Sequence, residues 1–369
     1  MEIIHIVLGK ANPERMNGVN KVVHQLATQQ QLAGKKVAVW GFTQQPEHNY
    51  PARHYTTRLF KTYRNKFSVD PTFITALQEV GANRTYHLHG GFNPIMTAIA
   101  KLLHQYGQPY VVTPHGAYNT IAMQKSRLRK RIFFSLFEKR MLRHANAIHS
   151  LGASEVAGLQ KIYPNQKSIL IPYGYEAAQC MPAKKERPAF VIGFCGRIDI
   201  YTKGLDLLLQ AFAQLQQQLP TAQLWIIGKG NDSAQLLQMA QRLGIVDQVS
   251  FWGSKFGTEK DELLAQLSVF AHPSRNEGLP TAVLEAAAMG IPCVVTQATN
   301  MGGYIQQYDA GATIALPDAQ ALYEALLQVH NRLQTDATAA LSANARNMVQ
   351  QAFNWNKIVN DFHKLYLHS

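Results

Sequence analysis

Two glutamates, Glu277 and Glu285, stand on either side of the start of a predicted helix. Gly278 and Pro280 mark this start, since proline suits the first helical turn, and Gly290 marks the end. Small apolar residues around Glu285 would bury nearly every side of the helix, and an unpaired carboxylate is costly to bury. We therefore expect Glu285 to pair with an internal cation or to accept hydrogen bonds from a ligand in a cleft. A solvated surface glutamate is the remaining alternative.

Two cations, Arg197 and Lys203, flank a loop that follows a predicted strand at residues 190–195 and leads into a helix. Backbone N–H groups and the helix dipole would add to their charge, and together these favour a bound diphosphate. Simple solvation of both side chains is the alternative. The diphosphate interpretation becomes stronger when it is joined to Glu277 and Glu285.

Glycines after three predicted strands could let a phosphate or a nucleotide approach the backbone closely. Gly18 follows the first strand, Gly196 follows the strand at residues 190–195, and Gly228 and Gly230 follow the strand at residues 223–227. Each of them alone is equally well explained as an ordinary turn residue.

Histidines stand at the ends of two further predicted strands. His115 comes after the strand at residues 110–113 and precedes Gly116, a place that favours ligand contact over packing. His87 and His89 form a similar but weaker group, and a buried core histidine is the alternative for each ring. The sequence shows neither a Ser-His-Asp order nor a spacing typical of metal ligands, so we expect no metal and no cofactor.

Residues 124–144 are strongly basic. They hold eight Lys and Arg against Glu138 alone, a balance of 8 − 1 = +7 within the net charge of +13 of the whole chain. Apolar residues recur at helical spacing among them, so the segment predicts a basic amphipathic helix that binds an anionic membrane or a polyanion. The residues that would meet this surface, or an acceptor there, are Arg127, Arg129, Lys130 and Arg131. A core helix with a solvated basic face is the alternative, and no motif accompanies the charge that would favour nucleic acid.

The elements that must position these residues alternate along the chain. Predicted strands at 3–8, 36–41, 85–88, 110–113, 147–149 and 168–171 alternate with helices at 19–33, 71–80, 94–106, the basic segment and 154–162. In a second run, strands at 190–195, 223–227, 249–252, 267–271, 292–295 and 312–314 alternate with helices beginning near residues 204, 233, 259, 280 and 319. This order predicts an α/β fold with parallel sheets covered by helices on both faces. Two facing Rossmann-like, doubly wound domains would place the strand ends, and hence the ligand, in the cleft between them.

Length and composition agree with two globular domains. The chain has 369 residues, of which 46% are hydrophobic and 16% are charged. We expect domains at residues 1–178 and 188–351, with the linker 176–188 between them. Residues 1–8 lack the basic start of a signal peptide, and no apolar run approaches the length of a membrane span. Cys180, Cys195 and Cys293 lie far apart, which is typical of reduced thiols in the cytoplasm.

Taken together, these motifs resemble the retaining glycosyltransferases of family 4, which have the GT-B fold. The matching pieces are Glu277 and Glu285 with seven residues between them, Gly196-Arg197 with Lys203, His115-Gly116, and the turn Pro172-Tyr173-Gly174. Residues 352–369 resemble the C-terminal helix that crosses back onto the first domain in this family.

The resemblance implies a metal-independent hexosyltransferase. Arg197 and Lys203 would hold the diphosphate of a UDP- or GDP-linked sugar, Glu285 would accept the ribose hydroxyls, and His115 would contact the transferred sugar. Glu277 would face the sugar and phosphate, together with the backbone N–H groups near the helix start at Gly278, Leu279, Pro280 and Thr281. Gly18 would leave room for the phosphates and the acceptor. The implied acceptor is a glycan or a lipid-linked glycan of envelope polysaccharide or glycoconjugate synthesis, at a cytoplasmic site or the inner face of the plasma membrane.

Three departures from the family pattern affect details. Asn17-Gly18 replaces the usual Gly-Gly, Tyr173 replaces the usual Asn, and the loop after residues 292–295 is longer than the usual short one, which predicts a specialised donor loop. Two other interpretations remain open: another nucleotide-sugar enzyme of the same fold, such as an epimerase, and a non-enzymatic protein that binds membranes or polyanions through its basic helix.

Overall fold

The computed structural model describes residues 1–12, 18–79, 83–124, 126–175, 189–335 and 337–367. The chain divides into two compact units, one formed by residues 1–174 with 355–369 and the other by residues 175–354. The predicted linker 176–188, the helix end at Val80, and Asn17 and Cys180 lie outside the described residues. No helix in the described part of the chain is both long and apolar enough to cross a bilayer.

Unit 1 is built on a seven-stranded parallel sheet with the strand order β3-β2-β1-β4-β5-β6-β7. The strands are β1 (Glu2–Leu8), β2 (Lys36–Thr43), β3 (Thr56–Lys61), β4 (Arg84–His89), β5 (Tyr110–Thr113), β6 (Ala147–Ser150) and β7 (Ser168–Leu170). The helices are α1 (Gly18–Leu32), α2 (Pro71–Gln78), α3 (Pro94–Gln105), α4 (Thr120–Gln124), α5 (Arg127–Phe133), α6 (Lys139–His144), α7 (Ala153–Ile162) and α16 (Trp355–Leu367), and a π-helical turn at Phe134–Glu138 joins α5 to α6.

Unit 2 repeats this arrangement with a six-stranded parallel sheet in the order β10-β9-β8-β11-β12-β13. Its strands are β8 (Val191–Cys195), β9 (Gln223–Ile227), β10 (Val249–Gly253), β11 (Val269–His272), β12 (Cys293–Thr296) and β13 (Gly311–Ile314). Its α-helices are α8 (Ile200–Lys203), α9 (Leu205–Gln218), α10 (Ser233–Arg242), α11 (Gly257–Leu264), α12 (Thr281–Ala288), α13 (Gly302–Tyr308), α14 (Ala319–Leu333) and α15 (Ala337–Ala352). Short 3-10 turns lie at Val246–Gln248 and Gln297–Thr299. The predicted pair of Rossmann-like domains is thereby confirmed.

Local sequence sets the helix starts. Asp70 and Asn93 cap α2 and α3 through their side chains, each just before a proline in the first turn. Asp199 and Asp318 cap α8 and α14 in the same way. Such caps satisfy N–H groups that have no partner within the helix.

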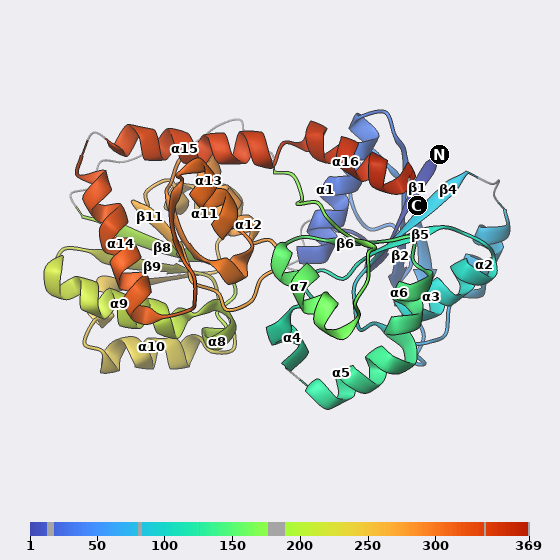
Figure 1. Ribbon diagram of the computed structural model, residues 1–369, viewed down its shortest axis with the longest axis horizontal. Coiled ribbons are helices and arrows are strands. Elements are labelled where there is room, and N and C mark those ends of the chain that lie inside the picture. Colours follow the sequence, from blue (N-terminus) through green and yellow to red (C-terminus); the bar gives the residue numbers. More distant parts are fainter. Residues whose placement is uncertain (13–17, 80–82, 125, 176–188, 336, 368–369) are drawn as a thin grey trace. The chain divides into compact units, whose positions relative to one another are not determined.

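The two faces of the unit 1 sheet differ in chemistry. One face carries an aromatic core, in which Trp40, Phe60 and Phe73 pack together near Tyr86. The other face carries buried histidines and lies under α1 and α16, which pack against each other (Figure 1). Gly174 keeps α16 in place, because a Cβ there would lie 2.3 Å from the ring of Trp355. Helix α16 belongs to unit 1, although it follows unit 2 in the sequence.

The basic segment differs from the single amphipathic helix that its sequence predicts. Of the apolar residues that recur at helical spacing, Ile132, Leu136 and Phe137 are 52%, 63% and 37% exposed, whereas Met141 is buried. The π-helical turn interrupts the regular hydrogen-bond spacing of the segment between α5 and α6. Glu138, the one acidic residue of the segment, is buried instead and accepts a hydrogen bond from Tyr118.

Candidate functional site

The candidate site in unit 2 lies where the strand order of its sheet reverses. The neighbours β8 and β11 are connected to opposite sides of the sheet, and the loops that follow them diverge at their carboxyl ends. Ligands of open α/β sheets bind at such a point. The loop after β8 carries Gly196 and Arg197, the short helix α8 that follows it ends at Lys203, and the loop after β11 carries Glu277.

Glu277 is the centre of a compact polar cluster. Its Oε1 atom accepts a hydrogen bond from Lys203 Nζ, lies 2.9 Å from His272 Nε2, and lies 3.2 Å from the donating Ser274 Oγ. Burial acts to raise the pKa of Glu277, but the His272 hydrogen bond and the Lys203 charge outweigh it and lower the pKa to about 2. Burial also lowers the pKa of His272. The cluster therefore contains a carboxylate, an ammonium group and a neutral imidazole that lie within one hydrogen-bonded group.

The backbone that carries Glu277 is held by the chain after β12. Asn300 Nδ2 donates to the carbonyl oxygens of Glu277 and Gly278 at 2.9 and 2.8 Å, and Glu277 N–H donates to Ala298 at 3.3 Å. Asn300 can do this because it adopts a left-handed backbone, with φ of 61°. The connection after β12 thus supports the Glu277 loop. It is not the long loop that the sequence suggests, because a 3-10 turn at Gln297–Thr299 and helix α13 follow β12 closely, and its predicted contact with a donor remains a prediction.

Helix α12 begins beside this cluster. Pro280 is its N-cap residue, and Leu279 and Thr281 are half-buried around the helix start. The first N–H groups of a helix have no partner within it and point outward with a partial positive charge. The arrangement is suited to an anion such as a phosphate.

Glu285 pairs with an internal cation, the first of the two expectations for it. Lys260 Nζ of α11 lies 2.9 Å from Glu285 Oε2, and the two side chains are only 17% and 10% exposed. Burial acts to lower the pKa of Lys260, but the charge and hydrogen bond of Glu285 raise it. Nothing in this pairing prevents the carboxylate from also accepting ribose hydroxyls, and that role remains a prediction.

The two cationic side chains that are predicted to bind a diphosphate have different surroundings. The side chain of Arg197 is 68% exposed, and its nearest carboxylate oxygen belongs to Asp199 at 3.7 Å. Lys203 is largely buried against Glu277. Arg197 can therefore swing towards an anion with little cost, whereas Lys203 would have to share its charge with Glu277.

The glycines after β8 and β9 are explained by close backbone contacts between the two loops that carry them. A Cβ on Gly228 would lie 1.9 Å from the carbonyl oxygen of Gly196, and a Cβ on Gly230 would lie 1.9 Å from that of Ile198. Gly196 and Gly228 also have positive φ angles. These residues are needed for close packing of the two loops, whether or not a nucleotide lies beside them.

In unit 1, His115 follows β5 in a left-handed backbone conformation, with φ of 55°. Glu155 of α7 holds this turn: its Oε1 accepts from Gly116 N–H and its Oε2 accepts from Leu151 N–H at 3.2 Å. Burial raises the pKa of Glu155 to about 7. The His115 ring lies 3.0 Å from His89 through Nε2 and Nδ1, and stacks near Tyr173. The predicted strand-end histidines His89 and His115 are thus in direct contact.

Three buried rings, those of His5, His87 and His89, each place a nitrogen within 4.8 Å of the others. Neutral histidines at this spacing can bind metals such as zinc. However, every nitrogen of the three rings lies within hydrogen-bond distance of a protein group. A metal would have to displace these bonds, so hydrogen bonding is the better account of the group.

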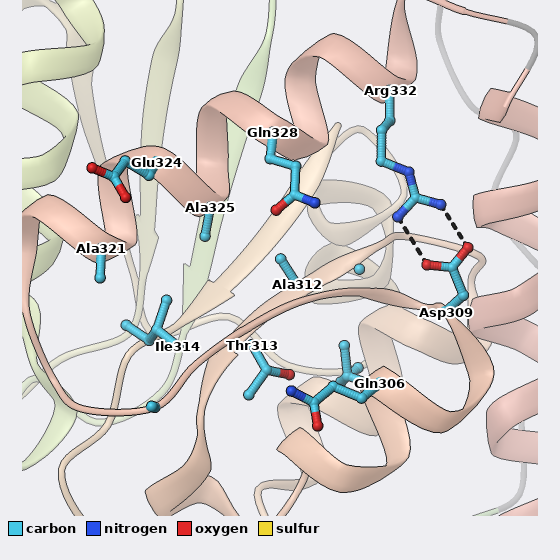
Figure 2. A pocket seen from close by; sticks show the side chains of 13 residues that line it. Gln306, Asp309, Ala312, Thr313, Ile314, Ala321, Glu324, Ala325, Gln328 and Arg332 are labelled. Carbon is cyan, nitrogen blue, oxygen red and sulfur yellow. Dashed lines mark hydrogen bonds and ion pairs between the residues drawn. The ribbon is translucent and has the colours of Figure 1, made fainter.

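Gly18 is the first residue of α1 and is exposed, and no atom of the residues that the structure describes is recorded within 4 Å of the place a Cβ would take. This leaves the room that its predicted role requires. A hollow of about 550 Å³ lies elsewhere, between α13, β13 and α14 of unit 2 (Figure 2). It contains none of the predicted site residues, and the Arg332–Asp309 ion pair lines one end of it.

Sequence reasoning missed four residues of the site. They are Lys260, His272, Ser274 and Asn300. The partners of Lys260 and Asn300 are distant in sequence, so no local pattern could identify these two, whereas His272 and Ser274 stand only five and three residues before Glu277. His272 gave the clearest sequence signal of the four, since it comes directly after the predicted strand at residues 267–271, as His89 comes directly after the predicted strand at residues 85–88.

Two family models match the chain. The model of "Glycosyl transferases group 1" matches residues 181–348, and that of "Glycosyl transferase 4-like domain" matches residues 17–174. Among curated proteins, a lipopolysaccharide core biosynthesis glycosyltransferase of Rhizobium meliloti is 31% identical over 157 residues, which cover 42% of this chain and 44% of that protein. A lipopolysaccharide glucosyltransferase of Escherichia coli is 26% identical over 187 residues, or 50% and 49% of the two chains. The chain spans about half the length of the curated relatives it matches.

Solved structures show the same fold. Sucrose-phosphate synthase from Thermosynechococcus elongatus superposes with a TM-score of 0.75 at 20% identity, covering 100% of this chain and 98% of that one. The Anabaena protein HepE, solved in complex with UDP-glucose, has a TM-score of 0.71 at 16% identity and covers 99% and 98%. With the two family models matched along most of its length, the chain belongs to the group 1, family 4-type glycosyltransferases of the GT-B fold.

Proposed function

We propose that the protein transfers a sugar from a UDP- or GDP-linked donor to a glycan or lipid-linked glycan in envelope polysaccharide synthesis. The observation that carries the proposal is the cluster of Lys203, His272 and Glu277 beside the start of α12, with Arg197 exposed on the neighbouring loop. The UDP-glucose complex of HepE and the polysaccharide relatives support the choice of donor and pathway class.

In the proposed reaction, the bond between the sugar C1 and the phosphate oxygen breaks while a bond from C1 to the acceptor oxygen forms. The acceptor proton passes to an oxygen of the leaving diphosphate, and the anomeric configuration is retained. Arg197, Lys203 and the N–H groups of α12 would stabilise the charge that develops on the diphosphate, so the protein needs no metal ion for this step. Glu277 would orient Lys203 and the sugar rather than attack C1.

The test is a thermal-shift panel of nucleotides and nucleotide sugars on the full chain. A ligand at about 100 times its dissociation constant adds roughly 2.7 kcal/mol to the free energy of unfolding, which is a visible shift. We expect UDP or GDP, and one sugar conjugate, to stabilise the wild type but not Arg197→Ala. Arg242→Ala, which removes an exposed charge at the end of α10, where the chain returns towards the amino end of β10, is the matched control and should respond like the wild type. A panel in which no nucleotide stabilises the wild type would overturn the proposal.

A second role, docking on an anionic membrane, is favoured by the surface of the basic segment. Leu128, Ile132 and Leu136 are 72%, 52% and 63% exposed, and Arg127, Arg129 and Arg131 lie among them in sequence. Lys130 differs, because its ammonium donates to the Ala122 carbonyl and lies 5.1 Å from the Phe92 ring. Exposed leucines and isoleucines between arginines are typical of helices that lie in a lipid interface.

Sedimentation with vesicles separates this role from charge attraction alone. We expect binding to vesicles with anionic lipid, loss of binding in Leu128→Ser/Ile132→Ser, and unchanged nucleotide shifts in the same variant. Leu243→Ser, an exposed leucine of unit 2, is the control. Equal binding of the double variant and the wild type would rule out insertion.

A further inference from the structure

Five polar side chains point to one face of the unit 1 sheet and meet there. His5 on β1 is in register with His87 on β4, and His89, two residues on, is in register with Thr113 on β5. His149 on β6 completes the row, and all five are buried. Residues on neighbouring parallel strands that are in register point to the same face. The row is therefore a consequence of the strand register.

One branch of hydrogen bonds runs from Gln30 of α1 to His115. Gln30 Oε1 lies 2.7 Å from His5 Nε2, His5 Nδ1 lies 2.9 Å from His89 Nε2, and His89 Nδ1 lies 3.0 Å from His115 Nε2. Burial lowers the pKa of His5 to about 4 and that of His115 to about 3, so these rings are neutral near neutral pH and carry one N–H each. A neutral ring that donates through one nitrogen must accept through the other.

The second branch fixes the direction of the first. It starts at the carbonyl of Ile171, which can only accept, so His149 Nε2 carries the proton at 2.7 Å from it. His149 Nδ1 then accepts from Thr113 Oγ1–H at 2.7 Å, and Thr113 Oγ1 accepts from His87 Nε2–H. His87 Nδ1 consequently accepts from the hydroxyl of Tyr366 at 2.8 Å.

Tyr366 connects the two branches. Because its proton points to His87, its oxygen accepts from Gln30 Nε2–H at 3.4 Å. This leaves only the oxygen of the Gln30 amide for His5. The protons then follow in one direction: His5 donates to Gln30 through Nε2, His89 donates to His5 through Nε2, and His115 donates to His89 through Nε2. Every proton of the two branches is assigned without conflict.

We propose that Gln30 is a positioning residue that, through His5 and His89, keeps the proton of His115 on Nε2 and so presents Nδ1 of His115 as a hydrogen-bond acceptor. Among the residues that the structure describes, none is a hydrogen-bond partner of this Nδ1 atom. Tyr366 of α16 keeps the Gln30 amide in the required orientation, so the C-terminal helix takes part in setting the chemistry of the His115 ring.

An accepting nitrogen selects the kind of group it binds. It takes a hydroxyl or an N–H group and disfavours phosphate or carboxylate oxygens, which have no proton to offer at neutral pH. The ring would thus recognise a hydroxyl of the bound sugar and not the diphosphate; this part of the inference rests on the proposed function. Losing one such hydrogen bond reduces binding of the reacting sugar by about 3- to 10-fold.

The test is the nitrogen-15 NMR spectrum of the histidine rings in the full chain, which distinguishes a protonated from an unprotonated ring nitrogen. In the wild type we expect a protonated Nε2 and an unprotonated Nδ1 for His115, identified by its absence in His115→Gln. Gln30→Met removes the acceptor with little change of size and should move His115 to the other tautomer or to a mixture. His24→Gln, on the same helix as Gln30 but bonded to Tyr55 outside the two branches, is the matched control and should leave His115 unchanged.

The outcomes test the hydrogen-bond relay from Gln30 through His5 and His89 to His115 separately from the transfer activity. A wild-type His115 protonated on Nδ1 overturns the proposal, even if Gln30→Met does not fold. If His115 in Gln30→Met is still protonated on Nε2, as in the wild type, the proposal is also overturned. If zinc added to the wild type binds stoichiometrically and shifts the signals of His5, His87 and His89, these rings form a metal site and the relay is wrong. If the protein transfers sugar, Gln30→Met should lower kcat/KM by about 3- to 10-fold with the nucleotide product binding unchanged; if no transfer is found, the spectra still decide.

Discussion

The Lys260–Glu285 pair gives a measurable test of how the unit 2 site is held. Its Nζ and Oε2 atoms are 2.9 Å apart, and the two side chains are 17% and 10% exposed. At an effective dielectric constant of about 20, charges this close attract by about 6 kcal/mol, most of which offsets the cost of removing both from water. Removing one partner leaves the other charge largely buried, which typically costs about 3–5 kcal/mol.

The perturbation is a double-mutant cycle of Lys260→Met, Glu285→Gln and the double variant. Each single change should lower the free energy of unfolding by about 3 kcal/mol, the low end of this range. The reason is that both side chains are partly exposed, so water can solvate part of the charge that is left unpaired. The double variant has no buried charge and should cost clearly less than the sum of the two, which gives a coupling free energy of about 2 kcal/mol.

The assay is native-state hydrogen exchange of peptides from β8 and β11, which reports opening of unit 2 separately from unit 1. The control is the exposed Lys255–Glu259 pair near the start of α11, with side chains 30% and 71% exposed, for which the same cycle should give at most about 0.5 kcal/mol. Costs that add within about 0.5 kcal/mol for Lys260 and Glu285 would refute the argument, because uncoupled groups add in this way.

Two further predictions concern unit 1 and the loops of unit 2. Burial lowers the pKa of His149 from 6.5 to about 4, so its unfolded form binds a proton that the folded form does not; its contribution to stability is complete above about pH 6.5 and is lost as the pH falls towards 4. Between about pH 6 and pH 5, His149→Gln should therefore flatten the pH dependence of unit 1 unfolding by about 1 kcal/mol per pH unit, as measured by hydrogen exchange, and an unchanged slope would show that the folded ring is charged. In unit 2, Gly228→Ala should destabilise by several kcal/mol because its Cβ would meet the Gly196 carbonyl at 1.9 Å, whereas Gly244→Ala, with open space around it and φ of 70°, should cost about 1 kcal/mol in the same unfolding assay; equal costs would contradict the clash.

Apolar runs made most of the fold predictable from sequence. The strands that form the centres of both sheets are buried on two faces, and their apolar residues mark them with errors of only one or two positions. Strand β3 was missed because it is an edge strand whose residues TTRLFK are mostly half-exposed. Helices α13 and α15 were missed because they are rich in Gln, Gly and Ala and lack a strong apolar stripe.

The site was predictable only where its residues stand at strand ends. Glu277, Lys203 and His115 lie in the segments that connect a strand to the next long helix, and the structure places Glu277 and Lys203 in contact. The partner of Glu285 was not predictable, since Lys260 lies on a helix whose sequence GTEKDELL has the pattern of a solvated surface. The π-helical turn has no sequence signal of its own, so the division of the basic segment into α5 and α6 was not predictable.

Unit 1 is discontinuous along the chain, and this affects the order in which it can be made. Residues 1–174 form its sheet, but Tyr366, which meets both Gln30 and His87, is synthesised only after all of unit 2. During translation the histidine row is not yet covered by α16. Folding of unit 1 can therefore be completed only after the whole of unit 2 has been synthesised. Unit 2, which is continuous, has no such delay and can fold first.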